Sequence, residues 1–167
     1  RRDAFCGKLS VCNNLYQYGI PFSLTQSHTL DPDSDVFAQE ITKFEAICRT
    51  VKGLTNVRIG AIGARPGAFK TVRYSEKLFE SVGISVHTLD LSDVFGWVKG
   101  LDDGDAGVTA EIDRIKSYAA YEHVPAASLL KIAKLSAIVR GWMADNGIVA
   151  TAFQCWDSLQ LNYGVNV

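Results

Sequence analysis

The stretch from Asn56 to Tyr74, NVRIGAIGARPGAFKTVRY, decides the fold. Residues 57–62 alternate between apolar and polar and then become wholly apolar, which is typical of a buried strand. The glycines and the proline of segment 63–67 predict a loop directly after that strand. A helix is expected from residue 74 or 75 to a glycine stop at Gly83. A strand, a polar glycine loop and a helix in this order place ligands at the carboxyl ends of strands in open α/β sheets.

The rest of the chain repeats this alternation of strands and helices, without a hairpin signal or an internal repeat. The pattern predicts an α/β fold, Rossmann-like or flavodoxin-like, with a mainly parallel sheet and helices on both faces. Right-handed crossovers then bring the loops after residues 62, 89 and 153 to one edge, although the strand order stays open. Further strands are predicted over 20–25, 84–89 and 148–153, and further helices over 5–19, 33–53, 108–121 and 125–146, with a short one from residue 92 or 93.

The organisation into domains has two readings. Residues 1–167 form either a single α/β domain or a domain-spanning fragment of a longer protein, and the absence of an initial methionine favours a fragment. The acidic, glycine-rich run 100–107, GLDDGDAG, is predicted to be a surface loop. A five-residue apolar stripe at helical spacing predicts a buried helix face worth about 1.5–3 kcal/mol per large side chain; its members are Phe37, Ile41, Phe44, Cys48 and Val51.

Composition excludes several functional classes. The formal net charge of -1 argues against a nucleic-acid or anionic-membrane surface. No apolar run approaches the ~18 residues that a membrane span needs, and no signal peptide is visible. The four cysteines show no CxxC spacing and are expected to be small buried side chains in a reducing compartment, which predicts a cytoplasmic protein.

Two groups of residues are candidates for ligand binding. Arg65, in the glycine loop, could clamp an anionic or hydroxylated ligand with its guanidinium, or could simply point to water or pair with a carboxylate. Gln154 follows the last strand and could both donate to and accept from sugar hydroxyls, while Trp156 beside it could stack on a sugar. The alternatives are that Trp156 belongs to the core and that Asp157 and its neighbour cap a following helix.

Other chemistry finds little support. The run GAIGARPG matches neither the dinucleotide fingerprint nor the P-loop, and no known catalytic motif appears. His28, His87 and His123 have no ligand spacing, so no metal site is expected within the chain; His28 alone merits a test. Nothing near Cys155 argues for an activated thiolate.

Several stretches resemble the L-fucose isomerase-like proteins, which are related more distantly to L-arabinose isomerase. The resemblance runs through the whole chain, and GARPGAFKTVRYSEKL (63–78) and QCW (154–156) are its most specific parts. It implies a parent enzyme that interconverts an aldose and a ketose with a divalent ion, commonly Mn²⁺, often as a homo-oligomer. It also implies that the metal ligands and acid–base groups lie beyond Val167, so neither metal nor catalytic residues are expected here.

The sequence therefore predicts the central fragment of a metal-dependent aldose–ketose isomerase, inactive alone, that takes a small-molecule sugar. Within that reading, Gln154 and Trp156 are the sugar-contacting residues carried over from the resemblance, and Arg65 is a weaker candidate. The alternative is a non-catalytic sugar- or phosphate-binding α/β module.

Overall fold

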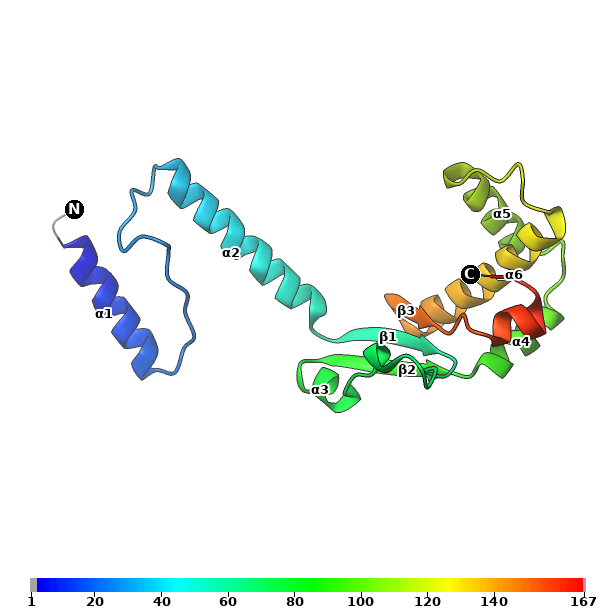
Figure 1. The fold of residues 1–167 in the computed structure, drawn as a ribbon. Helices are drawn as coiled ribbons and strands as arrows, with labels where there is room; N and C mark the ends of the chain where they lie inside the picture. Colours follow the sequence, from blue (N-terminus) through cyan, green and yellow to red (C-terminus); the bar gives the residue numbers. More distant parts are fainter. Residues whose placement is uncertain (1–2, 167) are drawn as a thin grey trace. The chain divides into compact units, whose positions relative to one another are not determined.

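The computed structural model describes residues 3–166 and divides into two compact units, Arg1–Gly53 and Leu54–Val167, shown in Figure 1. In the first unit, helix α1 (Ala4–Gln17) is joined by an irregular segment to helix α2 (Asp35–Leu54), whose last residue belongs to the second unit. The Ser34 hydroxyl accepts a hydrogen bond of 3.2 Å from the Phe37 N–H and so caps the beginning of α2.

The strand predicted over residues 20–25 is wrong. This segment has no regular secondary structure, and the first unit contains no other strand within its described residues. A strand needs a neighbour for its backbone hydrogen bonds, and Pro21 has no N–H to donate. The apolar pattern of residues 20–25 therefore did not suffice to predict a strand, because no neighbouring strand pairs with this segment.

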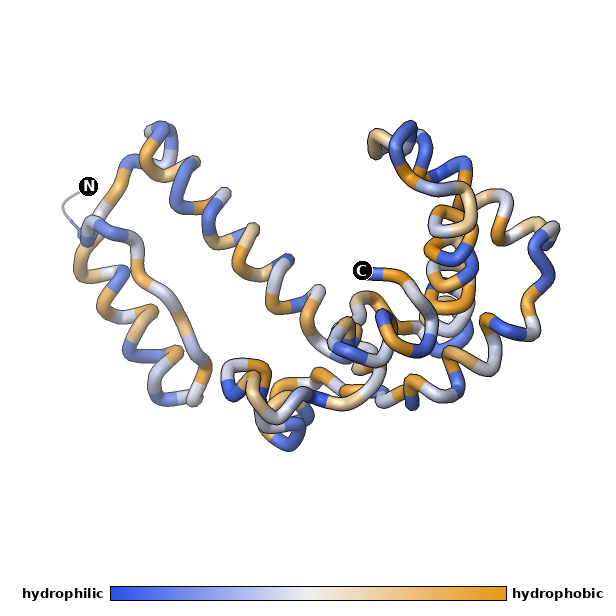
Figure 2. The backbone as a smooth tube through the Cα atoms, turned by 45° about the vertical axis from the view of Figure 1, so that its right-hand side comes forward, coloured by the Kyte–Doolittle hydropathy of each residue, from blue (hydrophilic) through white to orange (hydrophobic). Residues whose placement is uncertain are grey.

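The predicted burial of the α2 stripe is also wrong. None of the residues of α2 is buried, and Ile41, Phe44 and Val51 are 49%, 53% and 61% exposed. Figure 2 shows hydrophobic positions recurring along α2 between hydrophilic ones, so the amphipathic pattern is present without a layer inside the unit to cover it. The predicted stop at Gly53 fails as well, because this glycine is not left-handed and the helix continues through it.

The second unit is built on a three-stranded parallel sheet in the order β2-β1-β3. Its strands are β1 (Val57–Ile62), β2 (Ile84–Leu89) and β3 (Ala150–Phe153). Strand β3 is two residues shorter than predicted, because it begins at Ala150 and not at residue 148. This arrangement confirms the predicted α/β class with a parallel sheet and surrounding helices. The helices are α3 (Glu76–Ser81), α4 (Leu91–Gly100), α5 (Ala106–Tyr118) and α6 (Ala126–Asn146), with a 3-10 turn η1 (Lys70–Val72) and a π-helical turn η2 (Leu159–Tyr163).

The core of this unit lies between the sheet and helices α4 and α6. Ile62, Val94 and Leu159 are almost completely buried there. Trp142 of α6 lies directly on the central strand, because a Cβ atom built on Gly60 would stand 2.6 Å from its ring. Glycine at position 60 is thus a packing requirement of the sheet surface beneath the indole.

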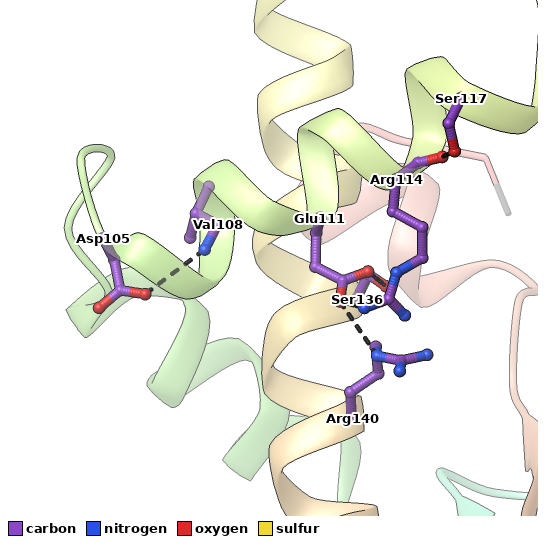
Figure 3. A network of polar contacts seen from close by, with 7 residues as sticks. All are labelled: Asp105, Val108, Glu111, Arg114, Ser117, Ser136 and Arg140. Atoms are coloured by element: carbon purple, nitrogen blue, oxygen red, sulfur yellow. Dashed lines mark hydrogen bonds and ion pairs between the residues drawn. The ribbon is translucent and has the colours of Figure 1, made fainter.

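Helices α5 and α6 are joined by one buried carboxylate, shown in Figure 3. Glu111 is only 6% exposed and carries ion pairs to Arg114 (3.2 Å) and Arg140 (3.0 Å) on the same oxygen. Its second oxygen accepts a hydrogen bond of 2.8 Å from the Ser136 hydroxyl. A buried carboxylate is tolerated when charge and hydrogen bonds satisfy it in this way.

The acidic run between α4 and α5 forms a short exposed connection over residues 101–105. Asp102 and Asp105 accept hydrogen bonds of 2.7 Å from the N–H groups of Gly104 and Gly107. Asp105 thereby caps the beginning of α5. The carboxylates and glycines of this run close a turn and start a helix.

All four cysteines are unpaired, but the expectation that they are buried is wrong. Cys6 and Cys48 are exposed, while Cys12 and Cys155 are partly exposed. Among residues 3–166, none of the helices combines the length and apolarity that crossing a membrane requires.

Candidate functional site at the strand exits

The carboxyl ends of all three strands meet at one edge of the sheet. Ile62 lies in register with Leu89 on one side and with Phe153 on the other. The Gly63 N–H donates to the Leu89 carbonyl and the Gln154 N–H to the Ile62 carbonyl, both at 2.9 Å. The predicted gathering of these loops at one edge is confirmed.

Gln154 ties the loop after β1 to the segment after β3. Its side-chain oxygen accepts a hydrogen bond of 2.6 Å from the Ala64 N–H, and its amide nitrogen donates at 2.9 Å to the Trp156 carbonyl. An amide can make four hydrogen bonds, so one N–H and one lone pair remain for a ligand. The structure thus places this predicted site residue where it can orient two loops and still bind a hydroxyl.

The close approach of these two segments depends on Gly63. This residue has φ +79, and a Cβ atom there would stand 2.5 Å from the side-chain oxygen of Gln154 and 2.8 Å from its Cβ. Any other residue would combine a strained left-handed backbone with a direct clash. Gly63, which directly follows β1, therefore leaves the space that the Gln154 side chain occupies.

Trp156 is 54% exposed and does not belong to the core, as one reading of the sequence had it. Its ring meets Phe69 edge-on, with 4.9 Å between ring centroids and an interplanar angle of 66°. Such a pair holds an aromatic side chain in place while leaving much of its surface open. Phe69 was missed by the sequence analysis; an aromatic residue inside a glycine-rich basic loop was the only available signal.

Arg65 lies on the same loop and has partners of its own. Its guanidinium forms a 2.8 Å ion pair with Glu76 and lies over the Tyr74 ring, 4.5 Å from the centroid. These contacts hold the loop against the start of α3, and the carboxylate of Glu76 balances the positive charge of Arg65. The structure brings Gln154 and Ala64 together but records no contact between Arg65 and Gln154, so Arg65 is placed to hold the loop.

Asp90 brings a carboxylate to the exit of β2. It accepts hydrogen bonds from the hydroxyl and the backbone N–H of Ser92, at 2.7 and 2.8 Å, and caps helix α4. The bond from the Ser92 hydroxyl, followed by that from the backbone, lowers the pKa of this carboxyl below its usual value. Asp90 is thus ionised at neutral pH and serves as a helix cap.

A metal ion does not fit the described residues. Within residues 3–166, no three histidine, cysteine, aspartate or glutamate side chains come close enough to hold one. His28 instead meets Phe5 edge-on at 5.3 Å between ring centroids, and His87 lies 3.4 Å from the Ser85 hydroxyl. Neither histidine belongs to a cluster of metal-binding groups.

A family model and several curated relatives match this chain. The model describes the N-terminal domain of fucose/sulfoquinovose isomerase and covers residues 1–55, which nearly coincide with the first compact unit. The sulfoquinovose isomerases of Priestia aryabhattai and Priestia megaterium are each 22% identical over 157 residues, covering 93% of this chain and 34% of their own length. That of Alkalicoccus urumqiensis is 24% identical over 127 residues, covering 75% of this chain and 28% of its own length.

The chain is similar to the fucose/sulfoquinovose isomerases over these stretches. This confirms the resemblance seen in the sequence. The chain spans about a third of the length of the Priestia relatives it matches. The family model ends at residue 55, close to the end of the first compact unit at Gly53, so its match does not extend into the sheet-bearing unit.

Proposed function

We propose that this fucose isomerase-like chain forms one wall of the sugar site of an aldose–ketose isomerase. The observation that carries the proposal is Gln154, which bridges two strand-exit loops beside the exposed indole of Trp156. An amide with unused hydrogen-bonding capacity next to an open aromatic face is the combination that binds a polyhydroxylated ring. A hexose is the proposed substrate class, and sulfoquinovose, after which the similar isomerases are named, is the first to test.

Each candidate residue has a distinct part in this proposal. Gln154 binds a sugar hydroxyl with its remaining N–H or lone pair, and Trp156 packs against the apolar C–H face of the sugar. Arg65 acts indirectly, because its pairing with Glu76 fixes the loop whose Ala64 N–H holds Gln154. All three are binding or positioning residues.

The proton-transferring groups and the divalent ion, Mn²⁺ by family resemblance, are proposed to lie outside residues 3–166. The described residues offer no group of metal ligands, so we assign no step of the reaction to a metal held by them. The unpaired cysteines support a reducing, cytoplasmic location as part of the same proposal.

The test uses protein expressed from the complete gene, assayed for interconversion of aldoses and ketoses with a divalent ion present. Gln154→Ala is expected to lower kcat/KM about 2- to 13-fold, from one lost hydrogen bond to a neutral hydroxyl, with bound metal unchanged. Trp156→Ala should raise KM, whereas Trp97→Ala, which removes a comparably exposed indole from α4, should leave KM unchanged.

Two outcomes would count against the proposal. A wild-type protein that binds sugars but converts none would make the chain a non-catalytic binding module. Loss of metal from Gln154→Ala, with sugar affinity intact, would move this residue from the sugar site to the metal site.

A further inference from the structure

A cavity of about 400 Å³ lies between helix α6 and the end of strand β3. Its apolar lining consists of Ile132, Leu135 and Val139 from α6 and of Phe153 from the end of β3. Cavities of about 300–1,000 Å³ with a mainly apolar lining and a few polar groups are typical of sites for small ligands. The polar groups in the lining therefore decide which kind of ligand this cavity fits.

Two of these polar groups, Ser136 and Arg140, are bound to the buried carboxylate of Glu111, as Figure 3 shows. The Ser136 hydroxyl donates its proton to Glu111 at 2.8 Å and so has no donor left for a ligand. Arg140 pairs with Glu111 through Nε alone, at 3.0 Å, and its side chain is 56% exposed. Within residues 3–166 its terminal nitrogens have no partner, so their N–H groups are the donors that the cavity offers to a ligand.

The charges around this cavity do not balance. Arg114 pairs at 3.2 Å with the same oxygen of Glu111 as Arg140 does. Among the described residues, no second carboxylate pairs with either arginine, so one negative charge stands against two positive ones. Of the two arginines, only Arg140 lines the cavity. A singly charged anion is the ligand that would balance the remaining positive charge.

We propose that this cavity binds a monoanionic carboxylate attached to a compact apolar group, such as an aryl or a branched alkyl carboxylate. The carboxylate accepts hydrogen bonds from the terminal N–H groups of Arg140, and the apolar group lies between Val139 and Phe153. A guanidinium presents two parallel donors that match a carboxylate. The ion pair between Nε and Glu111 holds that guanidinium in place before the ligand arrives, which lowers the entropy cost of binding. The interaction is non-covalent and does not depend on the proposed isomerase function.

The experiment measures Kd by titration calorimetry for protein expressed from the complete gene. Three probes are compared: benzoate, benzyl alcohol, which lacks the charge, and acetate, which lacks the apolar group. The main readout is the ratio of the Kd for benzyl alcohol to the Kd for benzoate, in wild type, in Arg140→Gln and in Arg114→Gln. Arg114→Gln is the matched control, because it removes an ion pair to the same oxygen of Glu111 from a residue that does not line the cavity.

The wild type should bind benzoate about tenfold or more tightly than either benzyl alcohol or acetate. Arg140→Gln should lower the ratio about tenfold or more, because it removes charge-assisted hydrogen bonds to the carboxylate. Arg114→Gln should lower it less than about threefold, because it changes the charge of the cluster without removing a donor from the cavity.

Cys155 provides a second readout that needs no variant. It is unpaired, half-buried and part of the cavity lining. Benzoate at about ten times its Kd should slow alkylation of this thiol about tenfold, since only the unliganded fraction reacts. Cys48, which is exposed on α2, should react at an unchanged rate. Mass spectrometry of the digested protein follows the two cysteines separately.

Three results would overturn the inference. The first is a wild type that binds benzyl alcohol or acetate as tightly as benzoate, or that binds no benzoate. The second is an equal ratio in Arg140→Gln and Arg114→Gln, and the third is a Cys155 that benzoate does not protect. A Cys155 that reacts only after the protein is diluted would also overturn it and would make the cavity an interface between two copies of the chain. None of these measurements involves a sugar, so their outcome is separate from that of the proposed function.

Discussion

Replacing Gly63 by alanine tests the geometry of the candidate site most directly. The new Cβ atom would stand 2.5 Å from the side-chain oxygen of Gln154 at a backbone φ of +79. The left-handed backbone costs a non-glycine residue about 1–2 kcal/mol. Displacing Gln154 adds about 1–2 kcal/mol, because the hydrogen bond from the Ala64 N–H is lost and the neighbours must shift. Gly63→Ala should therefore lower the free energy of unfolding by about 2–4 kcal/mol.

A matched glycine separates the two contributions. Gly147 ends α6 with φ +63, and nothing lies within 4 Å of a Cβ atom built there. Gly147→Ala should thus cost only the backbone contribution of about 1–2 kcal/mol. The assay is urea unfolding followed by circular dichroism, with a double-mutant cycle between Gly63→Ala and Gln154→Ala.

In the cycle, Gly63→Ala should cost about 1 kcal/mol less when Gln154 is already alanine, because the clash with the side-chain oxygen is gone and its hydrogen bond is already lost, while the 2.8 Å approach to the Cβ atom of residue 154 remains. A coupling energy near zero would refute the reasoning. Equal losses of unfolding free energy for Gly63→Ala and Gly147→Ala would also refute it, because the substitution at position 63 would then cost only backbone strain and nothing for displacing Gln154.

Three further predictions concern the second unit. Glu111→Gln should lower the free energy of unfolding by about 1–3 kcal/mol, because it removes the buried negative charge that pairs with two arginines. Glu45→Gln, which removes an exposed ion pair of α2, should lower it by less than about 0.5 kcal/mol. Equal losses in urea unfolding would contradict the argument from burial. Burial, with Asp103 nearby, raises the pKa of Tyr163 to about 12, and its hydroxyl donates to the Lys131 carbonyl at 2.8 Å. The pKa lies above the unfolded value, so this stabilisation is complete below pH 10 and lost as the pH rises towards 12; Tyr163→Phe should remove that loss in unfolding midpoints measured against pH. Gly60→Ala should cost about 1–3 kcal/mol and alter the near-ultraviolet circular dichroism, because its Cβ meets the Trp142 ring; an unchanged spectrum would contradict that contact.

The sequence predicts best where local pattern and tertiary structure agree. Strands 57–62 and 84–89 have the predicted bounds, because each is flanked by glycine or a helix cap that stops it sharply. The long helix up to Asn146 was also predicted, since Pro125 and the left-handed Gly147 delimit it. Local signals of this kind act over a few residues and can be read without the rest of the fold.

The errors occur where structure depends on partners far along the chain. Residues 20–25 have strand-like composition but no strand to pair with, and the α2 stripe has the right spacing but no covering layer in its unit. In the candidate site, Gln154 was found from its position after a strand. Its bond to Ala64, 90 residues away, and the ring contact between Phe69 and Trp156 could not be predicted, because neither leaves a local pattern.

The placement of the three tryptophans has a spectroscopic consequence. Trp142 is wedged against the central strand at Gly60, while Trp97 and Trp156 are 43% and 54% exposed. Trp142 is partly buried, so its emission should lie further to the blue and be quenched less by acrylamide than the emission of the two exposed indoles. One excitation wavelength thus reports on the packing of the sheet through Trp142 and on the surface through Trp97 and Trp156, without any added dye.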